Sequence, residues 1–260
     1  MRICILASGS SGNCTLFESK HTRVLVDVGI SWTRAAKSLT SIGVEPTSID
    51  AIVVTHEHTD HISGVGVAAR KLRCPIYGNI KTLYLTAPRL KNVEKDKIVP
   101  IDTGKPFMVK DLEFTAFPVP HDAASPVGYI VRSNGVKAGI ATDLGYTTNL
   151  VRYSLGGCNA LVLESNHDRK MLLDGAYPPE LKQRIAGKTG HLSNDQSADL
   201  LSKIMHDGLA NVFLAHLSEE NNTQQLAFNT AARVLNELAR QDVVLSLTFR
   251  DRPSDVITIE

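Results

Sequence analysis

The sequence THEHTDH at residues 55–61 directly follows the apolar run AIVV at residues 51–54. It therefore places three histidines and an aspartate at the end of a buried strand. In an extended backbone, residues two apart point the same way, so His56 and His58 present their imidazoles to one ion. Asp60 and His61 lie past the bend and face a second ion beside it. The pattern predicts a two-metal site; the alternative is a solvated polar loop or a cap of the following helix.

A two-metal site needs more ligands than this one segment supplies. Imidazole and carboxylate groups suit zinc, manganese or iron. Three later residues each follow an apolar run in the sequence, namely His121, Asp143 and His216. Each alone could be a polar residue at a strand end or a satisfied core group. Together they repeat the placement of the first motif, and we treat them as candidate ligands.

The order His-x-His-x-Asp-His, then a single His, an Asp and a last His, resembles the signature of the metallo-β-lactamase superfamily. The resemblance implies an α/β fold, an αββα sandwich of two mixed β-sheets flanked by helices, with the site along one edge. It implies that one metal has the ligands His56, His58 and His121, that the other has Asp60, His61 and His216, and that Asp143 bridges them.

The same resemblance singles out Asp27 as a carboxylate beneath the metals. Histidines that bind metals normally donate their other N–H to such a group. A loop cap is the alternative role for Asp27.

Three further segments are similar to YycJ/WalJ-type proteins of this superfamily: ASGSSGNC (7–14), LESNHD (163–168), and GHLSN (190–194) with LAHLS (214–218). These bacterial 5′-to-3′ DNA exonucleases are linked to mismatch repair and are kin to ribonucleases Z and J. The resemblance implies a binuclear phosphodiester hydrolase that uses a metal-bridging hydroxide. It also implies two divalent ions, Zn²⁺ or Mn²⁺, and a nucleic-acid substrate, DNA rather than RNA. Zinc and manganese both accept His and carboxylate ligands, so ligand type does not choose between them.

Only about 73 positions (216 − 143) separate Asp143 from His216, and predicted strands and helices occupy them. This segment is therefore too short to contain the β-CASP insertion of ribonuclease J. The substrate must be gripped by the core fold or by a partner subunit, which leaves a homo-oligomer open.

His191 resembles the histidine that nucleases of this superfamily place at the scissile phosphate without binding metal. Asp60 would orient the water and His191 would assist the leaving group, with a locally bonded histidine as the alternative. The helix that begins near Ser193 favours an anion at its start. His167 is either a support for the site or a substrate contact.

The glycine- and serine-rich loop of residues 8–13 could offer backbone N–H groups to a phosphate. Its candidate substrate-binding residues are Ser8, Ser10 and Asn13, beside His191 and Ser193. A plain turn between two strands is the alternative for this loop.

The composition bounds the possibilities. The chain has 260 residues, 43% of them hydrophobic, which fits one globular domain over residues 1–260. Its 28 Lys and Arg against 27 Asp and Glu give a net charge of +1, which excludes a basic or acidic tail.

Apolar runs fall far short of the roughly 20 residues that a membrane helix needs. Together with the early break at residues 8–12, this predicts a cytoplasmic protein. Four cysteines without a Cys-x-x-Cys pair argue against a disulfide scaffold.

The apolar pattern predicts strands and helices that alternate along the chain. Strands are expected at 3–7, 15–18, 24–28, 51–55, 112–119, 127–132, 137–141, 160–164, 212–215, 243–249 and 256–259. Helices are expected at 31–42, 63–72, 193–205 and 223–240. Asn134-Gly135 predicts a tight hairpin, and Ser193 with Gln196 predicts a capping box.

Three other functions are compatible with these residues. A phosphodiesterase for a small cyclic or nucleotide-like substrate is the nearest. A thioester or lactone hydrolase of the glyoxalase II kind uses the same metal set, but does not require the GHLS segment at 190–193. A binding module in which the ions only stabilise loops is the non-enzymatic alternative.

Overall fold

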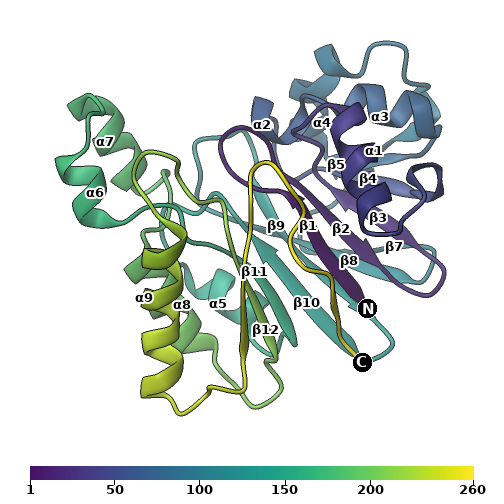
Figure 1. The fold of residues 1–260 in the computed structure, drawn as a ribbon. Helices are drawn as coiled ribbons and strands as arrows, with labels where there is room; N and C mark the ends of the chain where they lie inside the picture. Colours follow the sequence, from purple (N-terminus) through teal and green to yellow (C-terminus); the bar gives the residue numbers. More distant parts are fainter.

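Two seven-stranded mixed sheets pack face to face between two layers of helices (Figure 1). The computed structural model describes residues 1–260. The first sheet has the order β14-β1-β2-β3-β4-β5-β6, with strands Ile257–Thr258, Arg2–Ala7, Cys14–Glu18, Arg23–Val26, Ala51–Val53, Ile76–Asn79 and Ile98–Ile101. The second has the order β13-β12-β11-β10-β9-β8-β7, with strands Val244–Leu247, Asn211–Ala215, Ala160–Glu164, Val136–Ala141, Val127–Ser133, Leu112–Pro118 and Pro106–Val109.

The helices cover the outer faces of the two sheets. Helices α1, α3 and α4 lie on the first sheet, and α5, α8 and α9 lie on the second, while α6 and α7 project from one end (Figure 1). The α-helices are Trp32–Ser41, Thr59–Ile62, Val65–Leu72, Ile80–Thr86, Asn149–Leu155, Arg169–Asp174, Pro179–Ala186, Asn194–Ile204 and Gln224–Glu237. Short 3₁₀ helices span Pro46–Ser48, Ala87–Arg89 and Lys95–Lys97. No helix is long and apolar enough to cross a membrane.

Both faces of the central strands of each sheet are buried, as their continuous apolar runs require. Ile3 and Ile5 of β1 join a central cluster between the sheets. Cys4 and Leu6, which alternate with them, join the cluster under the outer helices. In the central cluster, the hydroxyl of the buried Tyr129 in the second sheet donates a hydrogen bond of 2.8 Å to the Val54 carbonyl beside the first sheet. The two sheets therefore share one core.

The predicted αββα sandwich is confirmed, and each of the eleven predicted strands is present. The sequence pattern missed β5, β6 and β7, and it also missed the short helices α2, α4, α5, α6 and α7. The predicted hairpin is confirmed, because Asn134 and Gly135 have φ of 50° and 80° and join the antiparallel pair β9 and β10. The capping box of Ser193 on α8 is also present. A single domain over residues 1–260 stays a prediction.

The sheet register brings several polar side chains to one edge. In the second sheet β10, β11 and β12 are parallel, with Ala141 opposite Leu163 and Glu164 opposite Ala215. The residues just past these strands therefore emerge at the same level. Asp143 and His216 have φ of 60° and 59° there, and Asp27 beyond β3 has φ of 60°. This left-handed conformation is uncommon outside glycine and turns the chain sharply at each strand end.

Candidate metal centre

Asp27 anchors the loop that carries the THEHTDH sequence. One of its carboxylate oxygens accepts the Thr55 N–H at 2.9 Å, and the other accepts the Thr55 hydroxyl at 2.8 Å. Nδ1 of His61 lies 2.7 Å from the same second oxygen. Because a carboxylate accepts hydrogen bonds, Nδ1 of His61 carries the proton and Nε2 is left to face the centre. Asp27 thus contacts both the backbone of this loop and the predicted ligand His61.

The same loop needs glycine at position 29. The Asp60 carbonyl lies so close to Gly29 that an added Cβ would stand 1.5 Å from it. The Asp60 carbonyl also accepts the Asn13 N–H at 2.7 Å, which ties the loop of residues 8–13 to the metal-binding loop. Any side chain at position 29 would push these two loops apart.

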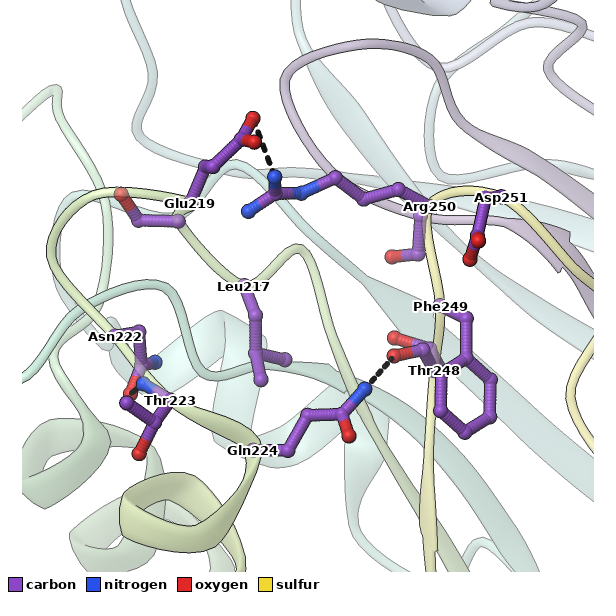
Figure 2. Close-up of a pocket in the computed structure, with 11 residues that line it drawn as sticks. Leu217, Glu219, Asn222, Thr223, Gln224, Thr248, Phe249, Arg250 and Asp251 are labelled. Carbon is purple, nitrogen blue, oxygen red and sulfur yellow. Dashed lines mark hydrogen bonds and ion pairs between the residues drawn. The ribbon is translucent and has the colours of Figure 1, made fainter.

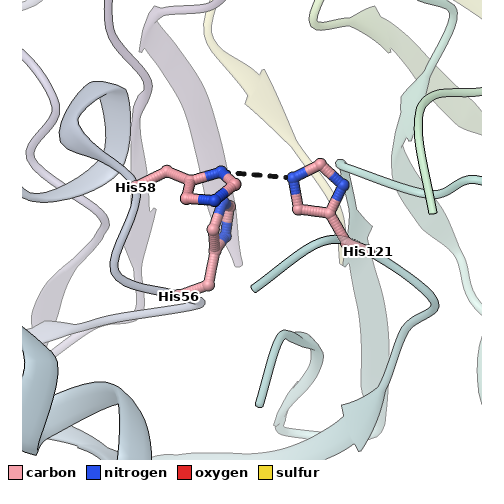
Figure 3. A group of neighbouring side chains, drawn as sticks. All are labelled: His56, His58 and His121. Carbon is pink, nitrogen blue, oxygen red and sulfur yellow. Dashed lines mark hydrogen bonds between the residues drawn. The ribbon is translucent and has the colours of Figure 1, made fainter. Parts of the chain in front are cut away.

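His56, His58 and His121 form a first trio (Figure 3). One nitrogen from each lies within 4.8 Å of the others, and His58 Nδ1 is 3.3 Å from His121 Nε2. His121 Nδ1 donates to the Gly190 carbonyl at 3.1 Å, which leaves Nε2 as the free nitrogen. Nε2 of the buried His56 has no hydrogen-bond partner.

Asp60, His61 and His216 form a second trio, again with ligand atoms within 4.8 Å of one another. The Asp60 carboxylate lies 3.5 Å from His61 Nε2 and 3.7 Å from His216 Nε2. His216 donates through Nδ1 to Glu164 at 2.8 Å, so its Nε2 is free. That nitrogen is buried and has no hydrogen-bond partner.

Asp143 lies between the two trios. One of its oxygens is 3.2 Å from His61 Nε2, in a geometry that makes no hydrogen bond, and the other is 3.6 Å from His121 Nε2. Its side chain is only 3% exposed. The structure thus brings together the seven predicted ligands, with Asp143 between the two predicted groups.

The donors of this cluster fit divalent cations. Buried polar atoms almost always have a partner, because an unsatisfied one costs about 1–3 kcal/mol. Here three buried atoms lack one and point into the same cluster: His56 Nε2, Asp143 Oδ2 and His216 Nε2. Imidazole nitrogens and carboxylates are ligands that zinc and manganese accept. The cluster is therefore suited to divalent metal binding.

The electrostatics of the cluster agree with this assignment. Burial disfavours a charged imidazole, yet the carboxylates of Asp143, Asp60 and Glu164 outweigh burial and raise the pKa of His216 to about 10. Asp143 and Asp27 likewise raise the pKa of His61 well above its ordinary range, against burial. A cation that binds these histidines must displace their protons, so metal affinity falls as pH falls.

Glu164 is a residue of the site that the sequence pattern did not predict. This side chain is fully buried at the end of β11 and accepts the N–H groups of Asp143, Leu144 and Leu192 at 3.1, 2.8 and 3.0 Å. It also accepts Nδ1 of His191 at 2.9 Å and of His216 at 2.8 Å. Burial favours the protonated acid, but the two histidines lower the pKa of Glu164 to about 2. The signal in the sequence was a carboxylate that closes the apolar run ALVLE at 160–164.

His191 stands at the open side of the centre. Its side chain is 21% exposed, and Nδ1 lies 2.9 Å from Glu164 and 3.7 Å from Asp143. Since Nδ1 is bonded to Glu164, Nε2 is the nitrogen left for a substrate. A ligand role is the other geometric option, because Asp143, Glu164, His191 and His216 also lie close enough to share an ion.

A cavity of about 300 Å³, here called the metal cavity, opens over both trios. Helix α7 and the residues before it, unpredicted from the sequence, form one wall with Tyr177, Leu181, Arg184 and Ile185. Nε of Arg184 lies 2.7 Å from the Asp122 carboxylate, which follows His121. The remaining lining residues are Ser10, His58, Asp60, His121, Asp122, Asp143, Asn166, Gly190, His191, His216 and Ser218.

The other candidate substrate-binding residues occupy different positions. Ser10 lines the metal cavity. The Ser8 hydroxyl accepts the His216 N–H at 2.7 Å and lines a neighbouring cavity. Asn13 Nδ2 lies 3.0 Å from His61 Nε2 and 3.3 Å from Asp60, so Asn13 contacts ligands rather than the cavity.

Ser193 and His167 lie side by side behind the cavity wall. Ser193 is fully buried, and its hydroxyl accepts the Gln196 N–H at the start of α8. Burial lowers the pKa of His167 to about 4, and its Nδ1 has no partner. Neither residue lines the metal cavity.

Comparison with known proteins agrees with the geometry. The family model of the Beta-lactamase superfamily domain matches residues 22–217. The chain belongs to the metallo-β-lactamase superfamily. The structure of the metallo-β-lactamase fold protein YhfI from Bacillus subtilis aligns with a TM-score of 0.72 and 16% identity, covering 99% of both chains, and supports the fold alone.

Two relatives align with nearly the whole chain. Exodeoxyribonuclease YycJ of Bacillus anthracis is 36% identical over 237 residues, which is 91% of this chain and 90% of that protein. Exodeoxyribonuclease WalJ of Streptococcus pneumoniae is 36% identical over 248 residues, 95% of this chain and 91% of that protein. The resemblance to this group is confirmed, and the chain is a metal-dependent hydrolase.

Proposed function

We propose that this protein is a 5′-to-3′ DNA exonuclease that hydrolyses phosphodiester bonds with two divalent ions, Zn²⁺ or Mn²⁺. The observation that carries the proposal is the pair of trios beside Asp143, with His191 at the open side of the same cavity. The similarity to two exodeoxyribonucleases over at least nine-tenths of each chain supports DNA as the substrate.

One ion would have His56, His58 and His121 as ligands, the other Asp60, His61 and His216, with Asp143 between them. When bound, such ions polarise a phosphoryl oxygen and lower the pKa of a bound water so that hydroxide is available near neutral pH. Asp27 and Glu164 fix the orientation of His61 and His216 through their Nδ1 atoms, so that each presents Nε2 to the centre.

The remaining steps belong to residues of the chain. The Asp60 side chain is 23% exposed at the cavity and can orient the attacking water through a free carboxylate lone pair. His191 donates a proton from Nε2 to the departing alkoxide, while Glu164, bonded to Nδ1, stabilises the charged imidazole. A carboxylate bonded to the far nitrogen fixes the tautomer and orientation of a catalytic histidine.

The test uses metal-quantified protein with 5′- and 3′-labelled single- and double-stranded DNA and RNA, in zinc or manganese. We expect stepwise, metal-dependent loss from the 5′ end of DNA, and none with His58→Ala. Loss from the 3′ end would overturn the polarity, and preference for RNA would overturn the substrate. Absence of cleavage by protein with two bound ions would favour a small phosphodiester or a thioester, which bis-p-nitrophenyl phosphate and a thioester assay distinguish.

A further inference from the structure

Figure 2 shows residues that line a second cavity, of about 480 Å³. It shares the lining residue Ser218 with the metal cavity. We call it the side cavity. One wall is the loop of residues 217–224 between β12 and α9, and the other is the segment of residues 248–251 after β13. Ser8 also contributes to its lining. Its size falls within the roughly 300–1,000 Å³ of small-molecule sites.

The side cavity adjoins the metal cavity. Ser218 lines both, two residues after the metal-centre residue His216. Ser8 lines the side cavity and Ser10 lines the metal cavity, so the tip of one loop lies between the two. A chain that passes through the metal cavity on this side therefore enters the side cavity next.

Arg250 is the cation of the side cavity. Its aliphatic part packs on Gly9, where an added Cβ would be 3.3 Å from Arg250 Cγ. Its guanidinium forms an ion pair with Glu219 across the cavity (Figure 2). The two side chains are 27% and 72% exposed. Such exposed pairs contribute at most about 1 kcal/mol, so a phosphate can displace the glutamate.

The rest of the lining suits a nucleoside. Phe249 also lines the side cavity, and the Arg252 guanidinium covers one face of its ring at 4.0 Å, so that only the other face is left for a base. Bases of single strands commonly stack on aromatic side chains. Opposite, Gln224 Nε2 makes only a long 3.5 Å bond to the Thr248 carbonyl, so its amide can exchange that partner for a base or sugar.

A phosphodiester bond has a nucleoside on either side, and the metal cavity of about 300 Å³ has room for only part of such a substrate. The geometry points to the side cavity as the subsite for the nucleotide next to the scissile phosphate, with Arg250 binding a backbone phosphate of the strand. This inference rests on the proposed function, because it requires a polynucleotide at the metal centre. In the absence of DNA, Glu219 pairs with the Arg250 guanidinium, and the DNA phosphate replaces it on binding.

The first test compares two substrates, a single-stranded oligodeoxynucleotide and bis-p-nitrophenyl phosphate, on the metal-loaded protein. Arg250→Ala should lower kcat/KM for DNA at least tenfold more than for the small diester, mainly through KM. It should also reduce the salt dependence of log(kcat/KM) by about one phosphate contact. Arg132→Ala is the matched control, since Arg132 pairs with Glu113 at the opposite end of the second sheet. Equal losses on both substrates would overturn the inference.

The second test looks for tighter binding of DNA, which a misfolded variant would not show. Glu219→Ala frees Arg250 and should lower the KM for DNA about threefold or more at low salt. Glu220→Ala, a neighbouring exposed glutamate outside any ion pair, measures the general effect of removing a negative charge. The double variant Arg250→Ala with Glu219→Ala should lose the gain. A gain no larger than that of Glu220→Ala, or one that survives in the double variant, would overturn the role of Arg250.

The wild-type protein separates the two proposals. If it cleaves the small diester but not DNA, the exonuclease proposal fails and takes this one with it. If it degrades DNA and Arg250→Ala does so equally well at every salt concentration, only the side-cavity inference fails.

Discussion

Four of the seven side chains at the metal centre come from one stretch of residues 56–61, whereas the other three follow three different strands. We call these the local half and the dispersed half. In the local half, one loop after β4 positions the side chains, and Asp27 ties that loop to β3. In the dispersed half, the parallel register of β10, β11 and β12 aligns the strand ends, and Glu164 joins them.

The difference shows two ways to position ligands. A short loop fixes them through local backbone geometry, so its pattern is visible in the sequence. A sheet edge fixes them through long-range pairing, and a buried carboxylate must then satisfy several groups at once. Glu164 accepts hydrogen bonds from five groups, whereas Asp27 accepts from Thr55 and His61 only.

The largest expected effect comes from breaking the local half at Asp60. Asp60→Ala removes a ligand of the second trio and the carboxylate that orients the water, so kcat should fall by more than about a thousandfold. Steady-state hydrolysis of bis-p-nitrophenyl phosphate measures this loss. Asp102→Ala, which breaks an exposed pair with Lys105, is the control. Turnover by Asp60→Ala within about tenfold of that of wild type would remove the assigned role of Asp60.

The next effect concerns His191, which lies at the dispersed half but carries the proposed proton. His191→Ala should keep its metal content and lose about a hundredfold to a thousandfold in kcat. Metal analysis of the purified variant checks the first part and kinetics the second. Full activity would remove the assigned role, and loss of one ion would make His191 a ligand instead.

The strands and the local half of the site were predictable because their signals are local, whereas the αββα arrangement and the grouping of the ligands followed from the resemblance to the superfamily. Alternating apolar runs marked the eleven strands, and the THEHTDH motif marked the local half. β5, β6 and β7 were missed because their short runs include Gly78, Pro100 and Pro106, which weaken a strand pattern. A sequence pattern does not say which residues meet in space. Glu164 was therefore predicted only as the last residue of a strand, and the contribution of α7 to the cavity wall was not predicted.

The two halves can be compared directly by replacing one carboxylate oxygen with an amide nitrogen, in Glu164 and in Asp27. Glu164→Gln should weaken metal binding by about 10- to 100-fold, because the negative charge beside His216 is lost and the new amide NH2 faces the N–H donors of Leu144 and Leu192. It should also lower the free energy of unfolding by about 3 kcal/mol, since a buried network is left unsatisfied. Asp27→Asn should cost less in both respects. Competition with a chromogenic chelator and urea unfolding measure the two quantities.

If Asp27→Asn costs as much as Glu164→Gln, the number of accepted hydrogen bonds does not decide the contribution of each carboxylate. Glu113→Gln provides the background value for a partly exposed glutamate in an ion pair.

The smallest expected effect is a pH dependence of stability to which His216 and His56 contribute with opposite sign. The pKa of His216 in the dispersed half is raised to about 10 in the folded, metal-free protein, against about 6.5 when unfolded. Its stabilisation is therefore complete below about pH 6.5 and is lost as pH rises through about 10. Urea unfolding of metal-free protein should show a progressive loss of stability between about pH 7 and pH 10. His216→Gln should reduce that slope and leave the contribution of His61, whereas metal loading should remove both contributions, because bound histidines are already deprotonated.

His56 in the local half should act in the opposite direction. Burial and the neighbouring His61 hold its pKa well below the ordinary range, so the unfolded chain binds the proton more readily. Stability should therefore fall as pH drops below about 6.5, and His56→Gln should reduce that acid limb while leaving the alkaline limb of His216 in place. If a single variant removed both limbs, His56 and His216 would titrate as one coupled unit across the two halves rather than as two independent groups.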